Sequence, residues 1–301
     1  MVNIYNIKNF ADKLRDLRLE NNLTQEEVAA LALISKKTLS RIENGTVIPK
    51  IETLEVLSDV YKTDLIKLYL ESRYINFELF SSILANIDIL IEKRFFDELI
   101  SEKNNLERLG SHVETGFLKI RIDQYILFID SILAMEEDDT SRAKLLTTKA
   151  LKLTKENFDV NNYRDFSFST LELRLLMILG KVYYLEDNYK SYREILYFCF
   201  SSVDPRDKFF ISTCINLGNV YKRDANYEKA LEVFNLGLEA ALKNNYLAEL
   251  DLLFFAKGSC EYKLGISTYK DSFSKALDFC TITGKDQTKI LIAEKIKKYF
   301  S

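Results

Sequence analysis

A glycine that recurs at nearly constant spacing is the feature that most constrains the fold of this 301-residue chain. Gly180, Gly218 and Gly258 lie 38 and 40 residues apart, and the first two stand in the same setting, Leu-Gly-x-x-Tyr. After the second glycine come Ala230 and Phe234, in the pattern Ala-x-x-x-Phe. A small residue lets two helices approach closely, and an aromatic ring fills the space between neighbouring helical pairs. The spacing therefore predicts an array of stacked helical pairs.

Composition extends this expectation to the whole chain. Only 2 prolines and 9 glycines occur in the sequence, whereas a β-sandwich or an α/β fold needs many tight turns. The hydrophobic content of 47% and the charged content of 29% are typical of a folded globular protein. No apolar run approaches the roughly 18 residues that cross a bilayer, and the N-terminus does not read as a secretory signal. We expect an all-α, cytoplasmic protein.

Residues for metal binding or catalysis are scarce. The four cysteines lie far apart without a Cys-x-x-Cys motif, and His112 is the single histidine, within a glycine-flanked loop. We expect free buried thiols in a reducing compartment, no metal and no cofactor. No Gly-rich phosphate-binding motif is present either. These observations argue against an enzyme.

The first 70 residues form a separate predicted domain of five short helices. Phe10 and Leu14 give the first helix an apolar stripe, with Arg18 expected outside it. Thr24-Gln-Glu-Glu27 is a capping box that starts the second helix. A third helix follows over residues 36–43 and ends at Asn-Gly. Two helices joined by a tight turn predict a helix-turn-helix domain.

The third helix separates apolar from polar residues as DNA recognition requires. Leu39 and Ile42 are expected to face inward, leaving a polar outer face near the start of the helix. Arginine suits bidentate contact with guanine, while lysine and hydroxyl groups serve phosphates or bases. The expected DNA contacts are Gln25, Ser35, Lys36, Lys37, Thr38, Ser40 and Arg41.

The segment Ser-Lys-Lys-Thr-Leu-Ser-Arg-Ile-Glu-Asn-Gly at 35–45, with Leu-Thr-Gln-Glu-Glu-Val-Ala at 23–29, resembles the XRE-type (Cro/C1) helix-turn-helix family of phage-repressor-like proteins. The resemblance implies that the positions named above contact DNA. Leu33 stands where the family has a glycine, which predicts a wider turn. The charges of residues 1–70 balance, so net charge does not separate a DNA-binding helix from a basic helix that is merely solvated.

The remaining residues, 71–301, resemble a tetratricopeptide array. We expect a right-handed superhelix of about five helical pairs, including one pair at 76–92 and 94–109. Residues 287–300 are predicted to form a capping helix. Its apolar residues Leu291, Ile292, Ile296 and Phe300 predict an additional contact, with a second copy of the chain.

One face of the repeats carries a polar stripe. Ser212, Asn216, Asn219 and Arg223 lie on one side of the helix expected around 211–223. Asparagine can donate to and accept from a peptide backbone, and cations suit a carboxylate. A solvated helix face is the alternative interpretation. The expected peptide contacts are Arg174, Lys181, Tyr184, Ser212, Asn216, Asn219, Lys222, Arg223, Ser259 and Tyr262.

The combination of the two domains resembles the RRNPP family of peptide-pheromone-responsive regulators, and within it the PlcR-like branch. That resemblance implies a cytoplasmic homodimer that binds a palindromic operator on double-stranded DNA and takes a short signalling peptide in the groove of its repeats. The family's peptide-binding asparagine, followed five residues later by tyrosine, matches Asn216. Its partner asparagine one repeat earlier falls on Lys181, which departs from the family.

Two other functions remain open from the sequence. A phage or mobile-element repressor would use the helical array only to dimerise and would bind no peptide. A protein-interaction adaptor would use the array to hold a protein partner, with a vestigial helix-turn-helix.

Overall fold

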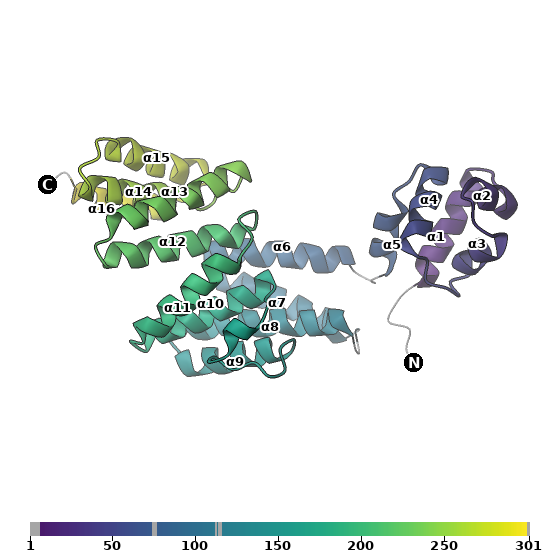
Figure 1. Cartoon of the computed structure of the whole chain (residues 1–301), viewed down its shortest axis with the longest axis horizontal. Coiled ribbons are helices and arrows are strands. Elements are labelled where there is room, and N and C mark those ends of the chain that lie inside the picture. Colours follow the sequence, from purple (N-terminus) through teal and green to yellow (C-terminus); the bar gives the residue numbers. More distant parts are fainter. Residues whose placement is uncertain (1–6, 74–76, 112, 114–115, 300–301) are drawn as a thin grey trace. The chain divides into compact units, whose positions relative to one another are not determined.

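The computed structural model describes residues 7–73, 77–111, 113 and 116–299, and every regular element in these ranges is a helix (Figure 1). The predicted all-α fold is confirmed. His112 lies outside the described residues. Across the ranges that the structure describes, no helix has the length and apolar character needed to cross a membrane. Backbone contacts divide the chain into two compact units, Met1–Ile129 and Asp130–Ser301, which we describe in turn.

The N-terminal five helices share one small core. Phe10, Leu14, Leu39 and Leu57 are each fully buried in it. Phe10 and Leu14 are four residues apart on the first helix, and Leu39 and Leu57 are each followed or preceded at three residues by another buried residue, so all four lie on inward faces. The helices are α1 (Ile7–Glu20), α2 (Gln25–Leu31), α3 (Lys36–Glu43), α4 (Ile51–Tyr61) and α5 (Leu65–Arg73).

The capping box at the start of α2 forms as predicted. The Thr24 hydroxyl accepts a hydrogen bond from the Glu27 amide at 3.2 Å, and the Glu27 carboxylate accepts one from the Thr24 amide at 2.7 Å. These bonds satisfy amides that the first turn of a helix otherwise leaves unpaired. The bond from the Thr24 amide, together with one that the Thr24 hydroxyl donates at 2.9 Å, lowers the pKa of the Glu27 carboxyl.

The first unit continues with α6 (Phe77–Lys93) and α7 (Phe96–Ser111), which pack on each other. This is the pair predicted at 76–92 and 94–109. Helix α8 (Phe117–Glu136) contains the division between the two units.

The second unit is a series of helical pairs. Within it α10 packs on α11, α12 on α13, and α14 on α15, each in the order that the glycine spacing predicts (Figure 1). A short 3-10 helix (Tyr163–Asp165) lies in the connection between the first two helices of the unit. The helices are α9 (Thr140–Lys152), α10 (Thr170–Leu185), α11 (Tyr189–Ser202), α12 (Lys208–Arg223), α13 (Tyr227–Lys243), α14 (Leu250–Lys263), α15 (Tyr269–Ile282) and α16 (Asp286–Lys297).

The recurring glycines mark the closest approaches between paired helices. A Cβ atom on Gly218 would lie 2.3 Å from the Phe234 ring, and one on Gly258 would lie 2.7 Å from the Phe273 ring. Real Cβ atoms do not approach other atoms so closely. At Gly180 the nearest atom would be 3.1 Å away, on Ile195, so this pair is less tightly packed. At Gly218 and Gly258 an aromatic ring of the paired helix occupies the space that a side chain would need.

The C-terminal helix α16 covers the end of the array. It does so with apolar residues that were predicted to contact a second copy of the chain. Ile292 and Ile296 are 3% and 8% exposed and belong to the core of the last repeats. For these two residues the prediction of an outward apolar strip is wrong, because they complete the core of this chain. Leu291 is exposed, and Phe300 lies outside the described residues.

The four cysteines are buried and free, as expected. Burial raises the pKa of the Cys214, Cys260 and Cys280 thiols to between about 11 and about 12. Within the described ranges, no group of three or more His, Cys, Asp or Glu residues is placed to hold a metal ion.

Candidate functional site

Helix α3 presents its cations to solvent and its apolar residues to the core. Leu39 and Ile42 are 0% and 1% exposed, whereas the side chains of Lys36, Lys37 and Arg41 are exposed. The helix begins at Lys36 because the Ser35 hydroxyl accepts a hydrogen bond from the Thr38 amide at 3.0 Å. The separation of the two faces is the one predicted from the sequence.

The three cations differ in their present partners. Lys36 forms an exposed ion pair with Glu26 of α2, and this contact is the main reason that the pKa of Glu26 is lowered. Among the residues that the structure describes, the side chains of Lys37 and Arg41 have no hydrogen-bond or ion-pair partner. An exposed ion pair contributes little free energy, so a phosphate can replace Glu26 at Lys36. All three cations are exposed to solvent.

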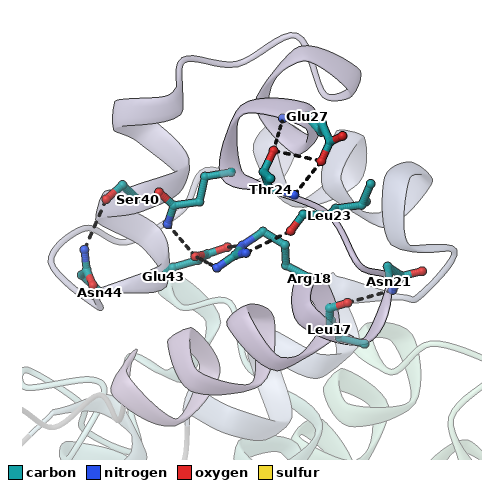
Figure 2. Close-up of polar contacts among 10 residues, drawn as sticks. Leu17, Arg18, Asn21, Leu23, Thr24, Glu27, Ser40, Glu43 and Asn44 are labelled. Atoms are coloured by element: carbon teal, nitrogen blue, oxygen red, sulfur yellow. Dashed lines mark hydrogen bonds and ion pairs between the residues drawn. The ribbon is translucent and has the colours of Figure 1, made fainter.

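The hydroxyl groups at the start of α3 bond mainly to one another and to the helix. The Ser35 and Thr38 hydroxyls lie 2.8 Å apart, within hydrogen-bond distance. The half-buried Ser40 accepts a bond from the Asn44 amide group at 3.3 Å (Figure 2). Each hydroxyl keeps a further lone pair or hydrogen for a ligand.

A buried network that the sequence did not predict fixes the orientation of α3. Arg18 of α1 donates two hydrogen bonds to the Glu43 carboxylate, at 2.8 and 3.1 Å, and a third to the Leu23 carbonyl at 3.0 Å (Figure 2). Arg18 and Glu43 are only 9% and 4% exposed. The hydrogen bond to Glu43 raises the pKa of Arg18. The network joins α1, the loop before α2 and the end of α3.

The placement of Arg18 corrects the prediction that it lies outside the apolar stripe of α1. It follows Leu14 by four residues and therefore lies on the same face of the helix. That spacing indicated that Arg18 is buried. A buried charged side chain needs a partner, however, and the spacing does not reveal Glu43, which is 25 residues away in the sequence.

Gln25 belongs to the same network. Its side-chain amide donates to Glu43 at 2.7 Å, and the side chain is half-buried. That Gln25 contacts a DNA phosphate stays a prediction. Only the polar atoms of its side chain that are not bonded to Glu43 are available for such a contact. One of its N–H groups already positions α2 against α3.

The turn between α2 and α3 is as tight as a glycine would make it. Leu33 has φ of +54°, in the left-handed region, and its side chain is 92% exposed. The Ile34 amide donates to the Ala29 carbonyl at 3.0 Å, which closes the end of α2. The expectation of a wider turn is wrong, because Leu33 adopts the conformation that glycine prefers. A residue with a Cβ atom does so at a cost of about 1–2 kcal/mol.

On the repeats, two predicted cations reach neighbouring helices. Lys222 of α12 donates to the Ser259 hydroxyl of α14 at 2.7 Å. Arg223 donates to the Tyr184 hydroxyl of α10 at 2.7 Å and lies over the Tyr184 ring, 4.8 Å from its centre. The predicted residues therefore come together in two groups that connect alternate helices.

The other predicted residues of α12 are arranged along the same helix. Ser212 donates to the Glu249 carboxylate at 2.9 Å, and the Asn216 amide group donates to the Ser212 carbonyl at 2.7 Å. Asn216 keeps its side-chain oxygen as an acceptor. Asn219 is exposed and, among the described residues, makes no side-chain hydrogen bond.

The remaining predicted residues lie at the edges of these groups. Arg174 is half-buried and Lys181 is exposed, both on α10. Tyr262 of α14 is 39% exposed and makes edge contacts with the Tyr269 and Tyr299 rings at 5.3 and 5.0 Å. Tyr299 was not among the predicted residues. Its aromatic neighbours are distant in sequence, so no local pattern indicates it.

Comparison with known proteins supports the two parts of the chain separately. Residues 14–68 match the helix-turn-helix family model. A segment of 63 residues is 43% identical to the cryptic phage CTXphi transcriptional repressor RstR of Vibrio cholerae. That alignment covers 21% of this chain and 57% of the repressor.

Three solved structures share the fold over nearly the whole chain. Bacillus thuringiensis PlcR in complex with the peptide PapR7 and DNA has a TM-score of 0.73 at 17% identity, over 95% of this chain and 99% of that chain. The chain has the fold of PlcR. ComR from S. thermophilus with DNA and its signalling peptide ComS gives a TM-score of 0.57 at 11% identity, over 97% of this chain and 100% of that one. The Streptococcus dysgalactiae SHP pheromone receptor Rgg2 gives 0.55 at 16% identity, over 97% and 99%.

Proposed function

We propose that the chain is a DNA-binding transcription regulator whose affinity for its operator is controlled by a short linear peptide bound to the repeats. In this proposal residues 1–70 bind DNA, and residues 71–301 bind the peptide and carry the dimer contacts. The protein acts in the cytoplasm as a homodimer on a palindromic operator, and it is not an enzyme. The observation that carries the proposal is the presence, in one RRNPP-type fold, of an exposed basic recognition helix and a polar face that connects alternate repeat helices.

The geometry of α3 supports the DNA-binding part. Arg41 and Lys37 are exposed and unpaired within the described residues, and the buried Arg18–Glu43 pair holds the helix from behind. A helix in the major groove reads bases with its outward side chains and needs a rigid orientation to do so.

The arrangement of α12 supports the peptide-binding part. An extended peptide has a backbone amide and carbonyl at nearly every residue, and each needs a partner when it is buried. Asn216 and Asn219 offer such partners, and Lys222 and Arg223 lie on the same helix. A face used only to dimerise through apolar contacts would not need them.

The similarity to the RstR repressor favours the second candidate, a phage or mobile-element repressor without a peptide ligand. That similarity is confined to 63 residues, however, and leaves most of the repeat array unmatched. It therefore supports DNA binding without deciding what the repeats do.

Two experiments test the proposal. Footprinting on the DNA upstream of the gene should show protection of an inverted repeat, with half-sites about 34 Å or a multiple of that apart. Calorimetry with synthetic peptides encoded beside the gene should show binding to the full-length protein, and the bound peptide should change the footprint. Footprints without any peptide binding would instead favour the plain repressor.

The dimer is tested by sedimentation. We expect a homodimer that weakens when the chain is truncated after Gly284, because α16 and its exposed Leu291 are then lost. A truncated protein that stays fully dimeric would place the dimer contacts elsewhere.

A further inference from the structure

Lys222 holds a positive charge in a half-buried position at the C-terminal end of α12. Its amino group donates to Ser259 of α14. Burial is the main reason that the pKa of Lys222 is lowered, and the nearby charge of Lys295 on α16 lowers it further, while Cys260 acts in the opposite direction. Lys295 is exposed and precedes Tyr299 by four residues at the end of α16.

Lys222 differs from other partly buried cations of the chain, which are paired with carboxylates. Lys285 has Asp251 at 3.2 Å, Lys155 has Glu172 at 3.6 Å, and Arg18 has Glu43 at 2.8 Å. Within the ranges that the structure describes, neither Lys222 nor Lys295 has a carboxylate at ion-pair distance. A desolvated charge without a counter-charge is costly, and a bound anion removes that cost.

Hydroxyl groups complete the surroundings of the two lysines. The Ser259 hydroxyl donates to the Ala256 carbonyl at 2.7 Å, so it meets Lys222 with a lone pair. Tyr262 follows Ser259 by three residues on α14, so both lie on one face of that helix. The Tyr299 ring contacts the Tyr262 ring edge-on. A tyrosine hydroxyl can donate a hydrogen bond to an anion.

We propose that Lys222 and Lys295, with Ser259, Tyr262 and Tyr299, form an anion subsite that binds a carboxylate of the ligand. The inference rests on the proposed function and narrows it, because it selects Lys222 from the four predicted cations and adds two residues. Two singly charged ammonium groups among hydroxyls match one carboxylate. A phosphate is better served by arginine or by a cluster of backbone amides, and the described contacts include neither here. The carboxylate is the C-terminus of a peptide or an Asp or Glu side chain.

The first experiment uses peptides encoded beside the gene, each made as the free acid and as the C-terminal amide. Calorimetry with full-length protein should show that amidation, or replacement of an internal Asp or Glu by its amide, weakens binding by roughly tenfold to a hundredfold. Lys222→Met should remove the difference between acid and amide, and Lys222→Arg should retain part of it. Lys243→Met, at an exposed lysine of α13, serves as the matched control and should change nothing. Equal binding of every acid and amide by the wild type would overturn the subsite but leave the proposed function intact.

The second experiment tests the subsite without a signalling peptide. Acetylation of Lys222 by acetic anhydride is followed by mass spectrometry, relative to Lys243, in the presence of N-acetylphenylalanine, its amide or inorganic phosphate. Protection of Lys222 by the free acid and not by the amide supports the subsite, even if no encoded peptide binds and the proposed function fails. Absence of protection by the acid, or protection by phosphate alone, would overturn the proposal.

Discussion

Helices α3 and α12 both carry the cations of a predicted binding site, but they hold them in different ways. On α3, Lys37 and Arg41 are exposed and, within the described residues, unpaired, while the fixed part of the site lies behind the helix in the Arg18–Glu43 pair. On α12, Lys222 and Arg223 already donate to hydroxyl groups of neighbouring helices.

This difference predicts different energetics for the two ligands. In the proposed function DNA would add contacts to an open surface, so Lys37 and Arg41 would contribute nearly their full interaction with a phosphate or base, whereas Lys36 would first give up Glu26. A ligand on α12 exchanges existing hydrogen bonds for new ones, and the net gain of each exchange is small. In the proposed function a peptide would therefore exchange the hydrogen bonds of Lys222 and Arg223, whereas the Arg18–Glu43 pair keeps the orientation of α3.

The largest expected effect comes from removing the support behind α3. Arg18→Met leaves the Glu43 carboxylate buried without its charged partner, with only the Gln25 amide still donating to it, which should lower the free energy of unfolding of the N-terminal domain by about 3–5 kcal/mol. Hydrogen-exchange mass spectrometry on the full chain should show faster exchange in residues 7–73 and unchanged exchange in α12–α15.

The double variant Arg18→Met with Glu43→Leu tests whether the loss of stability comes from the unpaired charge of Glu43. It should recover much of the lost stability, because both buried charges are then replaced by apolar groups. Equal exchange in the wild type and in Arg18→Met would show that the pair is not what holds α3.

A smaller effect is expected from an exposed cation of α3. Arg41→Ala should weaken operator binding by about 1–3 kcal/mol and relax specificity at one base pair, with no change in stability. Arg15→Ala, at an exposed position of α1, is the matched control. Fluorescence anisotropy on the footprinted operator and its single-base variants measures both. Equal losses in the two variants would indicate a general charge effect rather than a base contact.

On α12 the corresponding test is Asn216→Ala. Its side-chain oxygen is available to a peptide amide, and leaving that amide unpaired should weaken peptide binding by roughly tenfold to a hundredfold. Asn244→Ala is a close control, because the Asn244 amide group makes the same kind of bond to its own helix, at 2.8 Å to the Ala240 carbonyl, on α13. If both variants bind peptide like the wild type in calorimetry, the α12 face is not the peptide site.

The sequence predicted the parts of the molecule that depend on local spacing. The glycine repeats, the capping box and the inward face of α3 depend on residues within one helix or one helical pair, so periodicity indicates them. Arg18–Glu43 and Lys222–Ser259 join residues 25 and 37 positions apart, and only the packing of the helices determines those pairs. The prediction for Ile292 and Ile296 was wrong for the same reason. Periodicity shows that a helix has an apolar face but not which part of the molecule covers that face.

The smallest expected effect concerns the turn that joins α2 to α3. Leu33 is held in the left-handed region with its side chain in solvent, so it contributes almost no packing in return for the strain. Leu33→Gly should raise the free energy of unfolding of the domain by up to about 1 kcal/mol, the strain relief being partly offset by the greater freedom of glycine in the unfolded chain. Leu33→Ala keeps the strain and should change stability little.

Operator binding distinguishes a conformational role of Leu33 from a contact with DNA. If the side chain only tolerates its position, Leu33→Gly and Leu33→Ala should bind the operator as the wild type does, since Lys37 and Arg41 are unchanged. An equal loss of affinity in both variants, without a change in stability, would mean that the exposed leucine touches DNA. In that case the open surface of α3 would extend into the turn that precedes it.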